Sequence, residues 1–243
     1  MKIRYANAHR KPFLAISGGH GTARTLSKVK HGIGILLHGL NNITIVDNGT
    51  AALMGGGVQT GDIIPYLWSQ GKQTMTTACD CTGYLAPMLG GGHGWLQGRY
   101  GKATDQLISA RLILANGTAI HVSGNENKDL FWGIRGAGVN FGIVTRVKVK
   151  IYDREPTQDH WTATSFIFTH EKMEAVFTIA NEWLEASDRP AELAHYGIFA
   201  HNPDVDSVNV STVALLRQSQ LMTKAHCNLL GVLSGPVHSS AIR

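Results

Sequence analysis

Histidines stand inside glycine-rich stretches at two places in this chain, and two cysteines lie between them. Residues 17–21 read S-G-G-H-G, and residues 91–94 repeat the tetrad G-G-H-G. Between them, residues 79–81 read C-D-C. Imidazole and thiolate are nucleophiles and metal ligands, and glycine lets the backbone approach a ligand closely. The chemistry that these stretches suggest is metal binding, phosphate binding or covalent attachment of a cofactor, and a plain turn with an incidental histidine is the simplest alternative.

The common phosphate and metal motifs fit these stretches poorly. No G-x-x-x-x-G-K-[ST] string occurs, which argues against a P-loop. The string G-G-V-Q-T-G at 56–61 comes near a dinucleotide fingerprint, but its spacing differs and its acidic residue, Asp62, follows at once. Structural zinc sites usually have two pairs of ligands, each pair two to four residues apart. A zinc site here would draw on two cysteines and two histidines without that spacing, namely Cys79, Cys81, His20 and His93.

A flavin site is the fourth hypothesis for the glycine-rich stretches. Backbone N–H groups in such loops stabilise the charge of a pyrophosphate without any side chain. The run G-G-G at 90–92 allows a flat ring to approach the backbone, because no Cβ intervenes. A histidine and a cysteine placed at such a ring have the chemistry to bond to it covalently.

The composition is that of an ordinary globular protein rich in glycine. The chain has 243 residues, with 28 glycines, 12 histidines and a net charge of +5. Its lysines and arginines are scattered rather than gathered into a basic stripe, so we expect no binding to nucleic acid. No run of eighteen apolar residues occurs and the first residues lack the apolar core of a signal peptide, so we expect no membrane association. Its mild basicity suits an anionic cofactor.

The hydrophobic pattern divides the first part of the chain into strands and helices. It predicts strands within residues 11–17, 32–40, 43–58, 106–122 and 141–152, and helices at 60–70 and 127–135. Asn48-Gly49 and Asn116-Gly117 are typical of tight turns, so two of these segments should fold as hairpins. Thr60 and Asn127 are the expected helix N-caps.

A polar, proline-containing linker at 153–159 separates this part from a segment that is poor in glycine. The pattern beyond it predicts strands at 161–169, 195–200 and 208–216 and helices at 171–186 and 219–230. Such an order favours an antiparallel sheet backed by helices. The predicted fold class is therefore α+β, with domains at residues 1–152 and 153–243.

Four ordered motifs give the first domain a family resemblance. They are P-F-L-A-I-S-G-G-H-G at 12–21, A-C-D-C-T-G-Y-L-A-P-M-L-G-G-G-H-G-W-L-Q-G-R-Y-G at 78–101, D-Q-L-I-S-A-R-L-I-L-A-N-G at 105–117 and D-L-F-W-G-I-R-G-A-G-V-N-F-G-I-V-T at 129–145. Together they resemble the FAD-linked oxidases with the p-cresol methylhydroxylase and vanillyl-alcohol oxidase type of FAD-binding domain. The chain is most similar to the berberine bridge enzyme-like group, especially its fungal members.

The resemblance implies FAD as the cofactor and assigns residues to it. His20 would be attached to the 8α-methyl carbon of the flavin, and Cys79 would be joined to flavin C6 in a bicovalent arrangement, with a free buried thiol at Cys79 as the alternative. Thr82 would lie near flavin C4a, where the residue influences oxygen access. The remaining cofactor-binding positions would be Ser17, Gly18, Gly19 and Gly21 in the pyrophosphate loop, Gly83, Gly90, Gly91, Gly92 and Gly94 near the ring, and Gly142, Ile143 and Val144 beside the flavin or adenine.

The family chemistry implies an oxidation of a small molecule. A hydride leaves an activated C–H for flavin N5, a protein base takes the accompanying proton, and molecular oxygen reoxidises the flavin to give hydrogen peroxide. Fungal relatives favour a secondary metabolite as the substrate. Tyr196, His195 and Glu182 fall in the second domain, but no family motif maps to them, so no catalytic base is assigned.

The chain also departs from the family pattern at both ends. Family members carry an N-terminal subdomain before the first motif and run well past the position of Arg243, so we expect a first domain without that subdomain and a partial substrate domain. Three hypotheses follow: an oxidoreductase, which would use a partner chain if the substrate domain needs completing; an inactive flavin-binding remnant; and an unrelated metal-dependent enzyme using Cys79, Cys81 and His93. Localisation stays open, although family members are often secreted.

Overall fold

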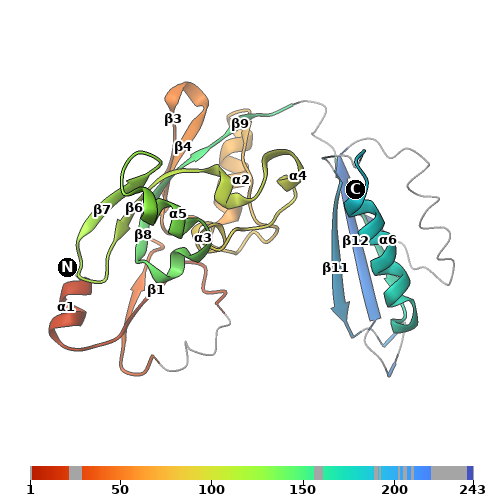
Figure 1. Cartoon of the computed structure of the whole chain (residues 1–243), viewed down its shortest axis with the longest axis horizontal. Coiled ribbons are helices and arrows are strands. Elements are labelled where there is room, and N and C mark those ends of the chain that lie inside the picture. The colour runs from red at the N-terminus through yellow and green to blue at the C-terminus, as the bar shows by residue number, and fades with distance from the viewer. Residues whose placement is uncertain are drawn as a thin grey trace. The chain divides into compact units, whose positions relative to one another are not determined.

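The chain folds into two compact units, Met1–Arg154 and Glu155–Arg243. A computed structural model describes residues 2–21, 29–155, 161–188, 191, 193–201, 203–204, 207–208, 211–219 and 240–242 (Figure 1). Both units combine helices with sheets, which confirms the α+β class.

A five-stranded antiparallel sheet forms the centre of the first unit. Its strand order is β3 (Ile43–Val46), β4 (Ala51–Gly55), β8 (Ile143–Lys150), β6 (Leu107–Ile113) and β7 (Ala119–Ser123). The β3–β4 and β6–β7 pairs are the two hairpins that the sequence predicts. The short 3₁₀ turn Asp47–Gly49 connects the first pair, with Asn48 at φ 53°.

Helices cover one face of this sheet and bury its apolar side chains. They are α2 (Thr60–Ser69), α3 (Leu85–Leu89) and α5 (Lys128–Ala137), and α5 contacts α3, β6 and β7 (Figure 1). The core between helices and sheet includes Met54, Ile63, Met88, Leu112, Ile134 and Val147. β7 and β8 largely alternate buried apolar with more exposed polar residues, as expected for an antiparallel sheet with one solvated face.

The helix starts differ in detail from the prediction. Gln59, not Thr60, is the N-cap of α2, and its backbone N–H donates to the Asp62 carboxylate at 3.1 Å. Asn127 is the N-cap of α5 as predicted, but its side-chain amide donates to the carbonyl of His121 at 2.6 Å instead of capping the helix. Residue propensity predicts where each helix begins to within a residue, but not which polar groups form hydrogen bonds at its first turn.

A second, smaller sheet in this unit consists of two parallel strands, β1 (Phe13–Ile16) and β2 (Ile33–Leu36). Parallel strands need a crossover connection of a dozen residues or more, and residues 17–32 provide it. The helix α1 (Lys2–Ala8), which the sequence analysis did not predict, buries Ile3 and Ala6, and Ile3 shares an apolar cluster with strand residues of β1 and β2. Neither the helix nor the parallel pairing follows from the hydrophobic pattern.

Several short elements complete the first unit. They are α4 (Gln97–Tyr100), the 3₁₀ turns Ala103–Gln106 and Gly138–Asn140, and a two-stranded pair of β5 (Lys72–Gln73) with β9 (Tyr152–Asp153). The last pair ties the end of α2 to the end of the unit.

In its described residues, the second unit is an antiparallel sheet with the helix α6 (Met173–Glu185) against it. The strand order is β11 (Ala194–Ala200), β12 (Ser211–Ser219), β10 (Trp161–Phe168) and β13 (Ser240–Ile242). The 3₁₀ turn His170–Lys172 leads into α6, which Figure 1 labels in this unit. Its Val176, Ile179 and Trp183 pack with Phe168 and Leu193. This confirms the predicted sheet backed by a helix. The helix predicted at 219–230 lies outside the described residues except for Ser219, which ends β12.

Tyr84 gives the first unit a pH-dependent element of stability. Its side chain is fully buried, and its hydroxyl has no hydrogen bond of ordinary geometry among the described residues. The Thr74 hydroxyl interacts with it but donates its own hydrogen to the carbonyl of Lys150 at 2.8 Å. Burial raises the pKa of Tyr84 well above its ordinary value, so the native state holds this proton more tightly than the unfolded state does. The corresponding stability is fully present below about pH 10 and is lost as the pH rises further.

We therefore expect Tyr84→Phe to raise the free energy of unfolding at neutral pH by about 1 kcal/mol, because it removes a buried hydroxyl without a hydrogen bond of ordinary geometry. Above about pH 10, the free energy of unfolding of this variant should also fall less steeply with pH than that of wild type. Tyr152→Phe is the matched control: its hydroxyl donates to Gln106 at 2.7 Å, and the substitution should lower stability at neutral pH. Urea unfolding at neutral and alkaline pH checks both expectations, and a loss of stability in Tyr84→Phe at neutral pH would contradict them.

Candidate functional site

The first candidate loop, residues 17–21, begins where β1 ends. In sheets with parallel strands, ligands bind beyond the carboxyl ends of the strands. β1 is half-buried, and exposure increases along the loop until Gly19 and His20 face solvent. Gly19 has φ +73°, a left-handed conformation that turns the chain after the strand. The fold thus places the His20 side chain in the open at the position where a ligand is expected.

The second candidate loop, residues 78–83, is held by the start of α2. The first N–H groups of a helix have no partner within it. Here the Thr60 N–H donates to the carbonyl of Thr82 at 3.0 Å, and the Gly61 N–H donates to the carbonyl of Asp80 at 2.8 Å. The Thr82 N–H in turn donates to the carbonyl of Cys79 at 3.2 Å. Cys79 is therefore exposed on a loop whose backbone is fixed.

The two loops pack directly against each other, backbone on backbone. A Cβ at Gly18 would overlap the backbone nitrogen of Gly83 and would lie 2.9 Å from the carbonyl oxygen of Cys81. A Cβ at Gly83 would overlap the Ser17 hydroxyl and lie 2.9 Å from the backbone nitrogen of Gly18. Only glycine fits at both positions. This contact brings the loop of His20 and the loop of Cys79 together although they are far apart in the sequence.

Ser17 has an unusual polar environment at this contact. Its hydroxyl is buried and has no hydrogen-bond partner among the described residues. Buried hydroxyls are nearly always hydrogen-bonded, so one without a protein partner calls for another acceptor or donor. It lies at the contact with Gly83, inside the cradle of glycines. A phosphate oxygen of a bound ligand is the kind of acceptor that this arrangement suits.

The glycine-rich segment 90–94 passes beside the extended segment that leads to Cys79. Gly90 ends α3, and Gly91 and Gly92 have φ +111° and +74°. Their carbonyls accept hydrogen bonds from Thr104 at 2.9 Å and Ala103 at 3.0 Å. A Cβ at Gly94 would overlap the carbonyl oxygen of Thr76, three residues before Cys79. The structure therefore brings the G-G-G run close to the segment that carries the thiol.

Gly142, Ile143 and Val144 have other neighbours than the two loops. A Cβ at Gly142 would overlap the carbonyl oxygen of Ile113 at the end of β6. Ile143 packs with residues of the parallel pair, whereas Val144 packs in the main core. These residues lie where the two apolar cores of the first unit meet.

The third and fourth motifs are joined by contacts that the sequence analysis missed. The Arg135 guanidinium donates to the Asp105 carboxylate at 3.2 Å and, through Nε, to the carbonyl of Thr104 at 3.4 Å. Thr104 is also the residue that donates to Gly91. Arg135 and Asp105 therefore help to hold the segment of Thr104, which in turn bonds to the glycine-rich segment at Gly91. Both residues lie within the quoted motifs, Asp105 in the third and Arg135 in the fourth, and this is the feature of the sequence that could have pointed to their role.

The two exposed thiols of the second loop are close neighbours. The sulfurs of Cys79 and Cys81 lie 3.1 Å apart. Hydrogen bonds from the Thr82 side chain and then from the Cys81 side chain lower the pKa of the Cys79 thiol. The pKa of the Cys81 thiol is raised, first by its hydrogen bond to Cys79 and then by burial. Cys79 is thus the better nucleophile of the pair.

The features considered for a metal site do not come together in the described parts of the chain. No group of three or more His, Cys, Asp or Glu side chains is arranged there to hold a metal ion. His93 is exposed, and its Nδ1 lies 2.9 Å from Oε1 of Gln97, a helix neighbour. Among the same residues, no helix is long and apolar enough to span a bilayer.

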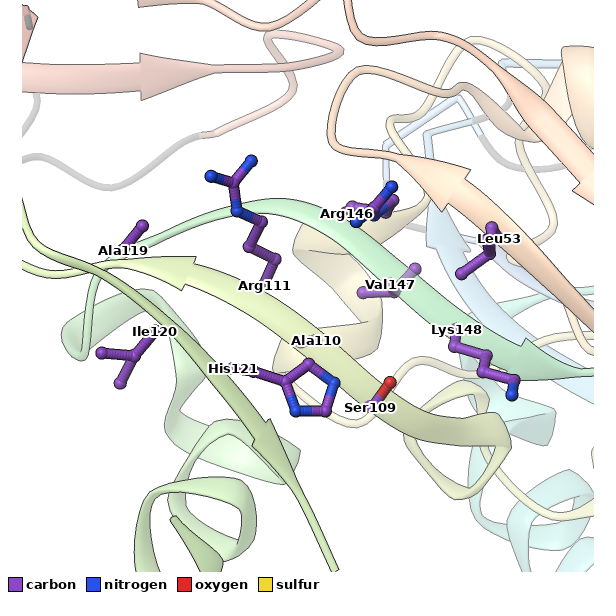
Figure 2. Close-up of a pocket in the computed structure, with 10 residues that line it drawn as sticks. All are labelled: Leu53, Ser109, Ala110, Arg111, Ala119, Ile120, His121, Arg146, Val147 and Lys148. Atoms are coloured by element: carbon purple, nitrogen blue, oxygen red, sulfur yellow. The ribbon is translucent and has the colours of Figure 1, made fainter. Parts of the chain in front are cut away.

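A hollow of about 320 Å³ lies elsewhere, on the solvated face of the five-stranded sheet. Figure 2 shows its lining, which comes from β4, β6, β7 and β8 and includes Arg111, Arg146, Lys148 and His121. Arg111 and Arg146 are directly opposite each other in the β6–β8 register. None of the predicted cofactor-binding residues lines this hollow, so it is separate from the glycine loops.

Comparison with known proteins gives these loops a family. Residues 2–123 match the family described as FAD binding domain. The chain is 39% identical over 218 residues to the FAD-linked oxidoreductase chry5 of Gibberella zeae, covering 89% of this chain and 42% of that protein. It is 38% identical over 222 residues to the FAD-linked oxidoreductase chyH of Penicillium rubens, covering 91% and 44%. The chain thus spans less than half the length of these relatives.

Solved structures share the fold. The 6-hydroxy-D-nicotine oxidase of Arthrobacter nicotinovorans superimposes with a TM-score of 0.76 at 25% identity, covering 99% of this chain and 53% of that one. The glucooligosaccharide oxidase of Acremonium strictum gives a TM-score of 0.77 at 21% identity, covering 99% and 50%, and its FAD is described as 6-S-cysteinyl, 8α-N1-histidyl FAD. With a family match over half its length, the chain belongs to the FAD binding domain family, and its cofactor is FAD.

Proposed function

We propose that this chain is the flavin-carrying part of an oxidase in which FAD is attached covalently through His20 and, when its thiol is free, through Cys79. The observation that carries the proposal is the contact of Gly18 with Gly83, which packs the loop of His20 against the loop of Cys79. In this proposal a single ring held between the two loops would bond to an imidazole from one segment and to a thiol from the other. The doubly linked FAD of the related glucooligosaccharide oxidase has the same two kinds of attachment.

The residues present fit the cofactor. The glycine cradle at residues 17–21 exposes backbone without side chains for a pyrophosphate, and the buried Ser17 hydroxyl has a hydrogen to donate to it. The start of α2 is not available as an anion site, because its first N–H groups donate to the carbonyls of Asp80 and Thr82. Glycine backbone and the Ser17 hydroxyl therefore carry the binding of phosphate.

The proposed reaction is oxidation of a small organic metabolite, of the secondary-metabolite class, at an activated C–H. FAD supplies the hydride acceptor, and oxygen takes the electrons from it. In this proposal Thr82 would lie beside the flavin and influence access of oxygen. It is half-buried and hydrogen-bonded at both its N–H and its carbonyl, so its backbone is fixed in place. The fungal relatives named FAD-linked oxidoreductases support the reaction class.

The proposal is tested by loading the purified chain with FAD and then offering small metabolites with a C–H beside oxygen or nitrogen. We expect bleaching of the flavin absorbance without oxygen, and hydrogen peroxide when oxygen is admitted. His20→Ala together with Cys79→Ser is the control that lacks both attachment points. Flavin that binds but is never reduced would support the alternative of an inactive flavin-binding remnant, and turnover only on addition of a second chain would show that a partner completes the substrate domain.

A further inference from the structure

Cys81 gives the flavin loop a second thiol that the proposed attachment does not use. The sulfurs of Cys79 and Cys81 are 3.1 Å apart and both side chains are exposed. A disulfide bond is about 2.0 Å long, so closing the bond requires an approach of about 1 Å. A soluble oxidant has free access to the pair.

The backbone around the pair allows this approach without unfolding. The carbonyls of Asp80 and Thr82 are fixed by hydrogen bonds from Gly61 and Thr60, one on each side of Cys81. The main chain is therefore anchored on both sides of Cys81, and the two thiols are held next to each other at the exposed surface of the loop. We expect the remaining approach of about 1 Å to come from rotation of the two side chains.

The two thiols also differ in reactivity. The two sulfurs share a hydrogen bond, and the Thr82 side chain adds a further hydrogen bond to the Cys79 sulfur. These contacts lower the pKa of Cys79 and raise that of Cys81. Cys79 is thus suited to attack an external disulfide first, and Cys81 to resolve the mixed disulfide that forms.

We propose that Cys79 and Cys81 form a reversible disulfide, and that this disulfide competes with attachment of flavin at Cys79. The Cys79 sulfur can form one of these bonds but not both. The redox state of the pair then decides whether FAD is held by His20 alone or by two residues. The disulfide stands on the geometry of the pair, whereas the competition rests on the proposed function.

The oxidant is a small-molecule disulfide such as oxidised glutathione. The Cys79 thiolate attacks one sulfur of the reagent, and the other half leaves as a thiolate. Cys81 then loses its proton and attacks the Cys79 sulfur, which forms the Cys79–Cys81 bond and releases the second half. Two electrons pass from the two cysteines to the reagent, and a dithiol reverses both steps.

Trypsin separates the relevant residues for mass spectrometry of the full chain. Cleavage after Lys72 and Arg99 releases residues 73–99, which contain Cys79 and Cys81 but not Cys227. Cleavage after Arg10 and Arg24 releases residues 11–24, which contain His20, because the Lys11-Pro12 bond resists trypsin. The thiol pair and the histidine are thus read from two different peptides.

The first arm of the experiment needs no flavin. The chain is treated with oxidised glutathione, alkylated with iodoacetamide and digested. We expect peptide 73–99 to have lost two hydrogen atoms and to take up no alkyl group, and dithiothreitol to restore two alkylation sites. Cys81→Ser should instead carry one glutathione on Cys79. A wild-type peptide that takes up two alkyl groups or a glutathione after oxidation overturns the proposed disulfide.

The second arm measures the competition. Wild type and Cys81→Ser are incubated with FAD in glutathione buffers of increasing oxidised fraction, and flavin is measured on both peptides. A ring-closing disulfide forms at a lower oxidised fraction than a bond to glutathione, because the two thiols are tethered. The midpoint is the ratio of oxidised to reduced glutathione at which half of the flavin on peptide 73–99 is lost. We expect this midpoint to be at least about tenfold lower for wild type than for Cys81→Ser. Equal midpoints overturn the competition.

The two arms keep separate failures apart. Flavin on peptide 11–24 in every buffer supports attachment at His20, whatever the thiols do. If that peptide never carries flavin, the proposed function fails while the first arm still decides the disulfide. If it carries flavin and peptide 73–99 carries none even in the reduced chain, the competition is overturned.

Discussion

His20→Ala should remove all flavin from the tryptic peptide of residues 11–24 while, in the reduced chain, peptide 73–99 keeps its flavin. His20 is the only imidazole in its peptide and is exposed just beyond β1, on the loop that contacts the Cys79 loop. Attachment to the flavin needs this ring nitrogen as the nucleophile. The acid-precipitated variant should therefore still be yellow through Cys79, and should become colourless only when Cys79→Ser is added.

His93→Ala is the matched control, because His93 stands in the same tetrad, G-G-H-G. It too is exposed, but it pairs with Gln97 and does not lie on the loop that contacts Gly83. This substitution should leave flavin on both peptides. A colourless pellet from His20→Ala alone would reject the Cys79 link. Loss of flavin in His93→Ala would mean that the attached histidine is His93 and not His20.

Gly18→Ala is expected to weaken FAD binding at least tenfold, a change of about 1.4 kcal/mol. The added Cβ would overlap the backbone nitrogen of Gly83, and backbone held by the start of α2 cannot move aside as a flexible side chain would. The two loops would have to separate, which breaks the cradle. The free energy of unfolding should fall by about 1–3 kcal/mol for the same reason. Titration with FAD and urea unfolding measure the two effects.

Two alanine substitutions separate the overlap from other effects of losing a glycine. A Cβ at Gly19 meets nothing within 4 Å, but φ is +73°, so Gly19→Ala should cost about 1 kcal/mol of stability without pushing the loops apart. Gly124 has neither a close neighbour nor a positive φ, and Gly124→Ala should be neutral. If Gly18→Ala binds FAD as tightly as Gly124→Ala does, the contact of the two loops is not what holds the cofactor.

The sequence was a good guide wherever the signal was local. The turns at Asn48-Gly49 and Asn116-Gly117 do join antiparallel strands, because these residues tolerate the left-handed backbone that such turns need. The apolar stripe at 171–186 does form a helix on the second sheet, since its period matches the helix. The first three motifs lie within residues 2–123, which the FAD binding domain family matches, whereas the fourth, at 129–145, lies beyond the matched residues.

Contacts between segments that are distant in the sequence could not be predicted from local patterns. Nothing local distinguishes a parallel from an antiparallel partner for β1, and a helix of seven residues such as α1 has too few turns for a periodic pattern. The overlap of Gly18 with Gly83 and the pair of Arg135 with Asp105 arise only when separate segments pack. The approach of Cys81 to Cys79 depends on side-chain placement, which the string C-D-C leaves open.

The most direct test of flavin attachment at these two loops is the mass of peptides 11–24 and 73–99 after the reduced, purified chain has been incubated with FAD. We predict that both peptides gain the mass of FAD, at His20 and at Cys79. Both peptides at their unmodified mass, in a chain that also leaves the fluorescence of added FAD unchanged, would contradict the assignment of these loops to the flavin.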